Sequence, residues 1–213
     1  MIYFCIYIPD YTAQYTMVDI VIPSSSSSVP FNSIHGWILI HQNLDNNFGS
    51  NRSWSFYRNG FGNSTGNYWA GLETMHQLTS NAAYRLRIEV QAKANNLWYS
   101  AEYDSFTIDS EAASYSIHAS GYTGDAGDSI EFTDSNSYHV MNGMKFSTLD
   151  VDNDLLSGKN CASVYGAGWW YNGCYYFLLT GTASTSEWDS LVDKVGLSSY
   201  KLLASRMLIK TSP

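Results

Sequence analysis

A run of alternating carboxylates is the part of this chain best suited to chemistry. Asp150, Asp152 and Asp154 open the segment 150–174, which reads DVDNDLLSGKNCASVYGAGWWYNGC. An extended or looping backbone with this spacing can bring at least two carboxylates to one hard cation, and oxygen ligands of this type select calcium, Ca²⁺. The segment therefore predicts a calcium site, with a solvated acidic turn as the alternative.

The acidic loop does not follow the EF-hand pattern. Counting from Asp150, the sixth position is Leu155 where an EF-hand needs glycine, and the twelfth is Cys161 where it needs glutamate. An Asp-rich loop of another kind, completed by backbone carbonyl groups, remains as the way to bind calcium.

Glycines and aromatic residues alternate shortly after the acidic loop. Gly166 and Gly168 precede Trp169, Trp170 and Tyr171. Glycine gives the backbone freedom, and the rings supply flat apolar surface. A shallow pocket of this composition suits a sugar acetamido group or another methyl-bearing ligand. Core packing is the alternative for the tryptophans, and we expect at least one of them to be core.

Two cysteines and two sequons bear on the compartment. Cys161 and Cys174 are thirteen positions apart in a glycine-rich, helix-poor segment. A disulfide closing a loop of that size adds about 3 kcal/mol in the chain-entropy model, and two buried reduced thiols are the alternative. Asn51 and Asn63 match the N-glycan acceptor pattern. Together these features predict an oxidising, extracellular setting.

Signals for catalysis are weak. The five histidines show no spacing that binds metals, and no Ser-His-Asp or Cys-His arrangement can be argued from the sequence. Glycoside hydrolysis needs two carboxylates at a defined separation across a cleft, which a tight Asp cluster does not resemble. We therefore expect no enzymatic activity, with hydrolysis as a minor alternative.

The composition indicates an ordinary globular domain. The chain has 213 residues, 45% of them hydrophobic, which is enough for a core. Aromatic residues reach 15% and charged residues only 14%, a bias toward strands rather than long surface helices. A net charge of −8 with eleven Lys and Arg argues against nucleic acid. No apolar run approaches the length of a membrane span.

The elements that position the acidic loop are expected to be mainly strands. Residues 83–90, AYRLRIEV, alternate apolar and polar types with the period of a strand. Further strands of a largely antiparallel sheet are expected at 37–41, 99–108 and 115–119, and an apolar stretch follows at 202–209. Short helices are expected at 53–59 and 72–78, a loop at the five-serine run 24–28, and a turn at GYTGDAGD, 121–128. Residues 1–22 are expected to be an atypical or mispredicted N-terminal segment with room for one strand, and residues 23–213 the domain.

Seven segments occur in the order that one known family has them. They are HGWILIHQNLD, NRSWSFYRNGFGN, YWAGLETMHQLTS, YRLRIEV, YTGDAGDSI, MNGMKFSTLDVDND and NCASVYGAGWWYNGC, covering about residues 34–174. The chain thereby resembles the fibrinogen C-terminal domain family, which includes ficolins, tachylectins, angiopoietins and tenascins. The resemblance implies an α+β fold with a central antiparallel sheet. It also implies an irregular, loop-rich C-terminal subdomain, about 120–213, that carries calcium and the ligand pocket.

Site residues follow from the matching motifs. The resemblance implies Asp152 and Asp154 as calcium carboxylates, with backbone carbonyl groups at Leu156 and Gly158. Asp150 matches a residue that supports the loop rather than binding the ion.

The disulfide Cys161–Cys174 is implied to border the ligand pocket, and the peptide between Gly173 and Cys174 to be cis. The implied ligand-binding residues are Tyr165, Trp170, Tyr171, Gly173, Cys174 and Tyr175.

Departures from the family pattern cluster at this pocket. Tyr175 stands where the family has histidine, and CYYFLLTGTAS replaces CHxxNLNGxY, which removes a polar ligand contact and a structural asparagine. The cysteine expected before the HGW motif is also absent, which leaves Cys5 without its expected partner.

The resemblance implies a secreted, calcium-dependent lectin that binds acetylated glycans or similar acetyl-bearing ligands in innate immunity, multivalent through an upstream region. The alternative is a protein- or receptor-interaction domain of the fibrinogen or angiopoietin type, or a degenerate copy that binds no sugar. The loss of the pocket histidine and asparagine favours the alternative.

Overall fold

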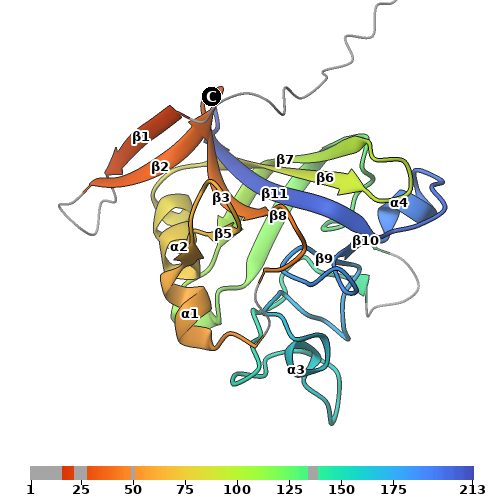
Figure 1. The fold of residues 1–213 in the computed structure, drawn as a ribbon. Coiled ribbons are helices and arrows are strands. Elements are labelled where there is room, and N and C mark those ends of the chain that lie inside the picture. Colours follow the sequence, from red (N-terminus) through yellow and green to blue (C-terminus); the bar gives the residue numbers. More distant parts are fainter. Residues whose placement is uncertain (1–15, 22–27, 49–50, 134–138) are drawn as a thin grey trace, which may run out of the picture.

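One antiparallel sheet organises the chain, in a computed structural model that describes residues 16–21, 28–48, 51–133 and 139–213. The main strands run in the order β1-β2-β3-β11-β6-β7-β8 (Figure 1). Their bounds are β1 Thr16–Val21, β2 Ser28–Ile34, β3 Trp37–Asn43, β6 Tyr84–Ala92, β7 Trp98–Ile108, β8 Ile117–Gly124 and β11 Leu202–Thr211. Two short strands, β4 Phe61–Gly62 and β5 Tyr68–Trp69, pair beside β3. The last strand of the chain therefore lies at the centre of the sheet.

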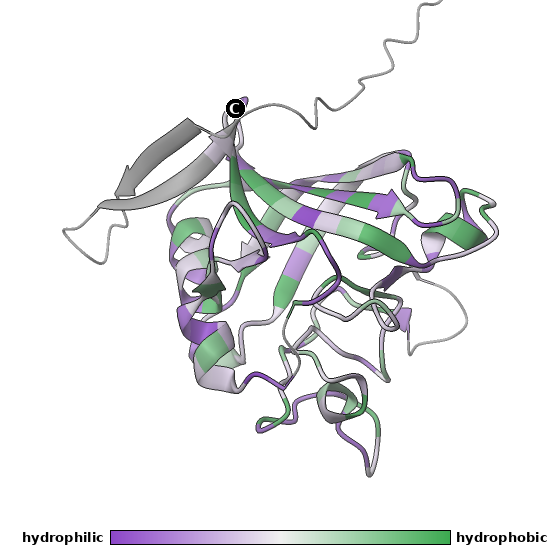
Figure 2. Cartoon of the chain, in the orientation of Figure 1, coloured by the Kyte–Doolittle hydropathy of each residue, from purple (hydrophilic) through white to green (hydrophobic). Residues whose placement is uncertain are grey.

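The alternation along β6 decides which face meets the core. Leu86, Ile88 and Val90 are fully buried in the main hydrophobic cluster. Arg87 and Glu89 lie between them in sequence and point to the opposite face, because successive strand residues alternate in direction. Figure 2 shows that β11, in contrast, has hydrophobic stretches separated by a hydrophilic band. The strand expected at 83–90 is confirmed.

Two helices cover the core face at one end of the sheet. They are α1 (Trp54–Asn59) and α2 (Leu72–Asn81), and α2 packs against β7 (Figure 1). The first ends at Gly60, where φ is 89° and a Cβ would lie 2.8 Å from the Ala70 carbonyl oxygen. Both expected helices are present, and α2 continues three residues beyond Leu78 because Thr79 is also buried against the sheet.

The rest of the core face is covered by irregular chain from the last third of the sequence. Its regular pieces are short: α3 Cys161–Tyr165, β9 Phe177–Leu178, β10 Glu187–Trp188 and α4 Ser190–Asp193, preceded by the 3₁₀ turn η1 Glu111–Ala113. In Figure 1 this region lies beneath the sheet and beside α1. The α+β fold with a loop-rich C-terminal region is confirmed.

One expected strand has shifted bounds, and the first half of one expected turn is strand instead. The strand expected at 115–119 begins only at Ile117 and continues to Gly124, into the stretch predicted as a turn. Its glycines suggested a turn, but Gly124 pairs with Ala101 of β7. A Cβ at Gly124 would lie 2.2 Å from the Ser100 carbonyl oxygen, so glycine permits close pairing there.

The N-terminal part of the described chain contains the expected strand but departs from the expected loop. The strand expected within 1–22 is β1, which pairs with β2. Of the serine run, Ser28 begins β2, contrary to the expected loop, whereas 24–27 lie outside the described residues. Cys5 also lies outside them, so its pairing stays a prediction. No helix in the described ranges is long and apolar enough to cross a membrane.

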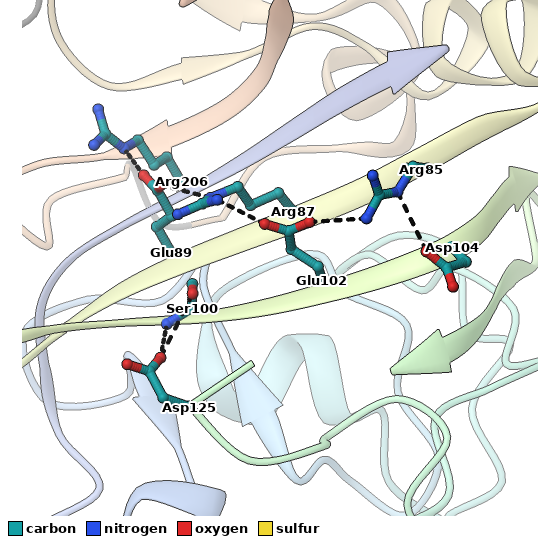
Figure 3. Close-up of polar contacts among 8 residues, drawn as sticks. All are labelled: Arg85, Arg87, Glu89, Ser100, Glu102, Asp104, Asp125 and Arg206. Atoms are coloured by element: carbon teal, nitrogen blue, oxygen red, sulfur yellow. Dashed lines mark hydrogen bonds and ion pairs between the residues drawn. The ribbon is translucent and has the colours of Figure 1, made fainter. Parts of the chain in front are cut away.

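The outer face of the sheet carries a ladder of ion pairs across β11, β6 and β7 (Figure 3). Glu89 accepts hydrogen bonds from Arg206 and, at 2.8 Å, from Arg87 Nε. Arg87 Nη1 donates to Glu102 at 2.6 Å. The ladder continues through Arg85 to Asp104, where it reaches solvent. Its members are balanced, with three arginines facing three carboxylates.

Candidate functional site

The acidic loop is fixed to the helical end of the domain by its first carboxylate. Asp150 Oδ1 accepts a hydrogen bond from the backbone N–H of Trp54 at 2.9 Å and one from the Thr148 hydroxyl at 2.7 Å. Both bonds hold the loop rather than a ligand. Asp150 therefore has the supporting position that the resemblance implies.

Asp154 organises the next turn. Its two carboxylate oxygens accept backbone hydrogen bonds from Cys161 at 2.7 Å and from Leu156 at 2.9 Å. Asp152 Oδ1 in turn accepts a bond from the Asp154 N–H at 3.3 Å. Burial raises the pKa of Asp154, and the neighbouring charge of Asp152 raises it further, against the two amide bonds, which lower it.

This arrangement fits a calcium ion of the kind that the resemblance implies. A carboxylate oxygen that accepts one amide hydrogen bond still has a lone pair with which to bind a metal ion. A divalent ion would also offset the charge repulsion between Asp152 and Asp154. Within the described ranges, no three His, Cys, Asp or Glu side chains gather as a metal cluster. An ion here would need main-chain oxygens as well, such as those of Leu156 and Gly158, which are predicted ligands.

The loop leads directly into a short helix and a disulfide. Asn160 Oδ1 accepts from the Ser163 N–H at 2.9 Å and so caps α3. Cys161 begins α3 and is bonded to Cys174, with 5.7 Å between their Cα atoms. The Gly173–Cys174 peptide is cis. The disulfide and the cis peptide implied by the resemblance are both present.

Removing this disulfide should destabilise the domain. The double variant Cys161→Ala with Cys174→Ala is expected to lower the free energy of unfolding by about 3 kcal/mol, because the closed loop restricts the unfolded chain. Urea unfolding of the variant and of the oxidised protein measures the difference. Equal unfolding midpoints, with both thiols of the parent protein mapped as free, would contradict the assignment.

Two of the predicted ligand-binding residues belong to the core instead. Trp170 and Tyr171 are 0% exposed. Trp170 Nε1 donates to the Tyr115 carbonyl at 2.7 Å, and its ring meets Phe146 edge-on. The Tyr171 hydroxyl donates to the Ala167 carbonyl at 2.8 Å. Neither ring presents a surface to solvent, so the prediction that they wall a pocket is wrong and the core-packing alternative holds.

The partly exposed rings at this site are Tyr165 and Tyr175, which meet edge to face with centroids 4.8 Å apart. The Tyr175 hydroxyl donates a short hydrogen bond to Glu187 Oε1. The other oxygen of Glu187 accepts from Lys201 Nζ at 2.6 Å. We call these four residues the tyrosine cluster. They lie beside the half-exposed Gly173 and Cys174, which the sequence also assigned to the ligand site.

A second carboxylate makes the surroundings of the tyrosine cluster acidic. Asp189 is half-buried, and burial is the main reason that its pKa rises to about 7. The charges of Glu187 and Asp193 raise that pKa further, while His139 and Lys201 oppose the rise. A cationic group brought to this place would favour the ionised carboxylate.

Both glycan acceptor residues are on the surface. Asn51 and Asn63 are exposed. Asn63 Oδ1 accepts from the hydroxyl of Thr65, the third residue of its sequon, at 2.7 Å. Exposure is compatible with modification, which stays a prediction for both residues.

Sequence reasoning missed Glu187, Lys201 and Asn160. Asn160 had a local signal, since asparagine before a short run of helix-compatible residues is a common N-cap. Glu187 and Lys201 had none, because Glu187 reaches Tyr175 across 12 positions and Lys201 reaches Glu187 across 14, without any shared period.

The geometry places this chain in a definite class. A central antiparallel sheet, few helices, and an acidic loop tied by a disulfide to an irregular C-terminal region define a fibrinogen-like globe. The fibrinogen-like globe domain of human ANGPTL2 superposes with a TM-score of 0.78 at 29% identity, covering 94% of each chain. A lamprey fibrin D-dimer complexed with the peptide Gly-His-Arg-Pro-amide superposes with a TM-score of 0.79 at 27% identity, covering 92% of this chain and 68% of the other.

Residues 31–210 match the family model described as fibrinogen beta and gamma chains, C-terminal globular domain, and the chain belongs to that family. Curated relatives include bovine angiopoietin-4, 41% identical over 68% of this chain, and the human fibrinogen alpha chain, 40% identical over 70%. Protein scabrous of Drosophila melanogaster is 33% identical over 84%. The chain spans only 28%, 18% and 21% of the lengths of these three relatives.

Proposed function

We propose that this chain is a secreted, non-enzymatic recognition domain that binds a protein ligand through the tyrosine cluster, with Ca²⁺ stabilising the acidic loop beside it. The observation that carries the proposal is the pair of partly exposed rings, Tyr165 and Tyr175, set among carboxylates. Tyrosines supply rigid amphipathic contact area, which suits binding of a protein segment.

The charge at the site favours a ligand with a basic group. Glu187 is already paired with Lys201, whereas Asp189 faces mainly other carboxylates. A peptide with a basic side chain or a free amino terminus would complement Asp189. The peptide Gly-His-Arg-Pro-amide in the lamprey relative has both features. The names of the angiopoietin and fibrinogen relatives are consistent with this protein-interaction class.

Acetylated glycans are the second candidate. The flat rings of Tyr165 and Tyr175 beside the cis peptide Gly173–Cys174 could receive an acetyl methyl group. The prediction of glycan binding depended partly on the rings of Trp170 and Tyr171, which are buried. The hydroxyl of Tyr175 already donates a hydrogen bond to Glu187. The protein-ligand candidate therefore ranks first.

Calorimetry can separate the two candidates. The protein is titrated with Gly-His-Arg-Pro-amide and, separately, with N-acetylglucosamine. We expect heat from the peptide and a loss of affinity of about tenfold in Asp189→Asn, because the charged partner is removed. Between pH 6 and pH 8 the affinity of the parent protein should rise relative to that of Asp189→Asn, since Asp189 ionises with a pKa of about 7 and the peptide's own titration is common to both proteins.

The control for this titration is Asp109→Asn, which changes a surface carboxylate paired with His118 and should leave the affinity unchanged. Binding of the sugar, with no response to the peptide, would reverse the ranking of the two candidates. If neither ligand produces heat at saturating calcium, the tyrosine cluster is not a binding site for either of them and the proposal fails.

Calcium binding is tested on the loop itself. We expect a dissociation constant of roughly 10⁻⁴ to 10⁻³ M, the range of extracellular modules. Asp154→Asn should abolish the heat of calcium titration because it removes a carboxylate ligand. Asp150→Asn is the matched control, since Asp150 holds Trp54 and Thr148 rather than the ion. A full calcium response in Asp154→Asn would contradict the proposed ligand set.

A further inference from the structure

A surface pocket lies on α1 and shares no lining residue with the tyrosine cluster. It has a volume of about 340 Å³ and is lined by Ser55, Phe56, Asn59 and Gly60. Phe56 is 52% exposed, an unusual position for a ring of that size. The pocket therefore combines apolar surface with two polar side chains.

An arginine with no carboxylate partner among the described residues adjoins this pocket. The guanidinium carbon of Arg52 lies 5.6 Å from the Phe56 ring centre and 4.2 Å from that of Phe61. Arg52 has no carboxylate partner, and its buried Nε has no acceptor, among the residues that the structure describes. Cation–π contact offsets part of the cost of this charge, and an anion at the outer guanidinium nitrogens would offset more.

Arg58, on the same helix, has both a carboxylate partner and a side-chain amide partner. Its Nε is 2.9 Å from Glu111 Oε2, and its Nη1 donates to Asn59 Oδ1 at 3.2 Å. The bond from Arg58 orients the Asn59 amide and leaves its Nδ2 group to donate elsewhere. The pocket thus offers donors from Asn59 and from the Ser55 hydroxyl beside the Arg52 charge.

We propose that the α1 pocket binds a protein segment carrying a carboxylate next to an apolar side chain. The carboxylate pairs with Arg52, the apolar side chain packs on Phe56, and Ser55 or Asn59 donates to the segment's backbone. None of the residues that line this pocket belongs to the tyrosine cluster, so the proposal does not depend on the ligand of that cluster.

Charge arguments select this occupant over other anions. A nucleic acid or a polysulfated glycan needs several cations in a row, whereas this chain has a net charge of −8 and Arg52 is the cation that adjoins the pocket within the described part of the chain. A small inorganic anion would leave the exposed Phe56 ring uncovered. A single carboxylate joined to an apolar group would pair with the charge of Arg52 and cover the exposed ring of Phe56.

The test uses two capped dipeptides that differ by one charge, N-acetyl-Leu-Asp-amide and N-acetyl-Leu-Asn-amide. Each is titrated into ¹⁵N-labelled protein and followed by NMR. The aspartyl peptide should shift the Arg52 Nε–H signal and the amides of Ser55, Phe56 and Asn59, with half-saturation at roughly millimolar concentration. The asparaginyl peptide should bind at least about tenfold more weakly.

Variants localise the effect. Arg52→Gln should remove the response, and Phe56→Ser, a change at an exposed ring, should weaken it while leaving the fold intact. Lys93→Gln, which removes an exposed cation from the turn between β6 and β7, is the control and should respond like the parent protein. Equal shifts from both dipeptides, no shifts from either, or an unchanged response in folded Phe56→Ser would each overturn the proposal.

Discussion

Replacing Glu89 by glutamine is expected to lower the free energy of unfolding by about 3–5 kcal/mol, the range for breaking a buried ion pair. Glu89 is 5% exposed and pairs with both Arg87 and Arg206. The substitution keeps the shape but leaves two nearly buried guanidinium groups short of charge. Urea or thermal unfolding at neutral pH measures the loss.

The control for Glu89 is a pair at the exposed end of the same ladder. Asp104 lies 3.3 Å from Arg85, but its side chain is 68% exposed. Asp104→Asn should therefore cost less than about 1 kcal/mol, as exposed pairs do. Similar losses in the two variants would show that burial does not determine the strength of the ladder (Figure 3).

Acid should destabilise the domain through His41. Burial lowers the pKa of His41 to about 3 from its ordinary value of 6.5. Its ring packs 4.8 Å from Phe48 and 5.7 Å from Trp69, and its Nδ1 has no hydrogen-bond partner among the described residues. The folded protein therefore holds His41 neutral in conditions where the unfolded chain protonates it.

The sign follows from the lowered pKa. Above pH 6.5, His41 is neutral in both the folded and the unfolded chain and the free energy of unfolding has its full value. As the pH falls from 6.5 toward 3, only the unfolded chain protonates His41, so the free energy of unfolding decreases. The loss should reach about 3 kcal/mol at pH 4.5 and on the order of 5 kcal/mol near pH 3.

The measurement for His41 is urea unfolding at pH 7.5 and pH 4.5. In His41→Leu the difference between the two pH values should shrink by about 3 kcal/mol relative to the parent protein. Carboxylates such as Asp189 and Asp128, whose pKa values are raised, act in the opposite sense, so only the comparison isolates His41. His118→Gln, which changes an exposed histidine, should show the same difference in the free energy of unfolding between the two pH values as the parent protein. The prediction would be contradicted if the difference between the two pH values were the same in His41→Leu as in the parent protein.

Local patterns were sufficient for most of the fold. The period of two in residues 83–90 identified β6, and the helical spacing from Leu72 identified α2, because both signals depend on neighbours within a few positions. The same reasoning failed at Gly124, where pairing with Ala101 across the sheet decided the conformation and the glycine signal pointed to a turn. Sequence could not supply that pairing, which joins residues 23 positions apart.

For the acidic loop, the sequence by itself determined the order of the parts: carboxylates, then a cysteine, then aromatics, then the second cysteine. Adjacency along the chain is enough to bring Asp154 to Cys161 and Cys161 to Cys174. The resemblance built on these motifs was therefore confirmed at the level of the family and fold.

Only the tertiary structure decided which rings face solvent and which charges are paired. Trp170 and Tyr171 are adjacent to partly exposed tyrosines in sequence but are enclosed by residues from distant segments, including Tyr115. Glu89 and Arg206 pair across 117 positions. Burial and ion pairing depend on the packing of segments that are remote in sequence, so no local pattern encodes them.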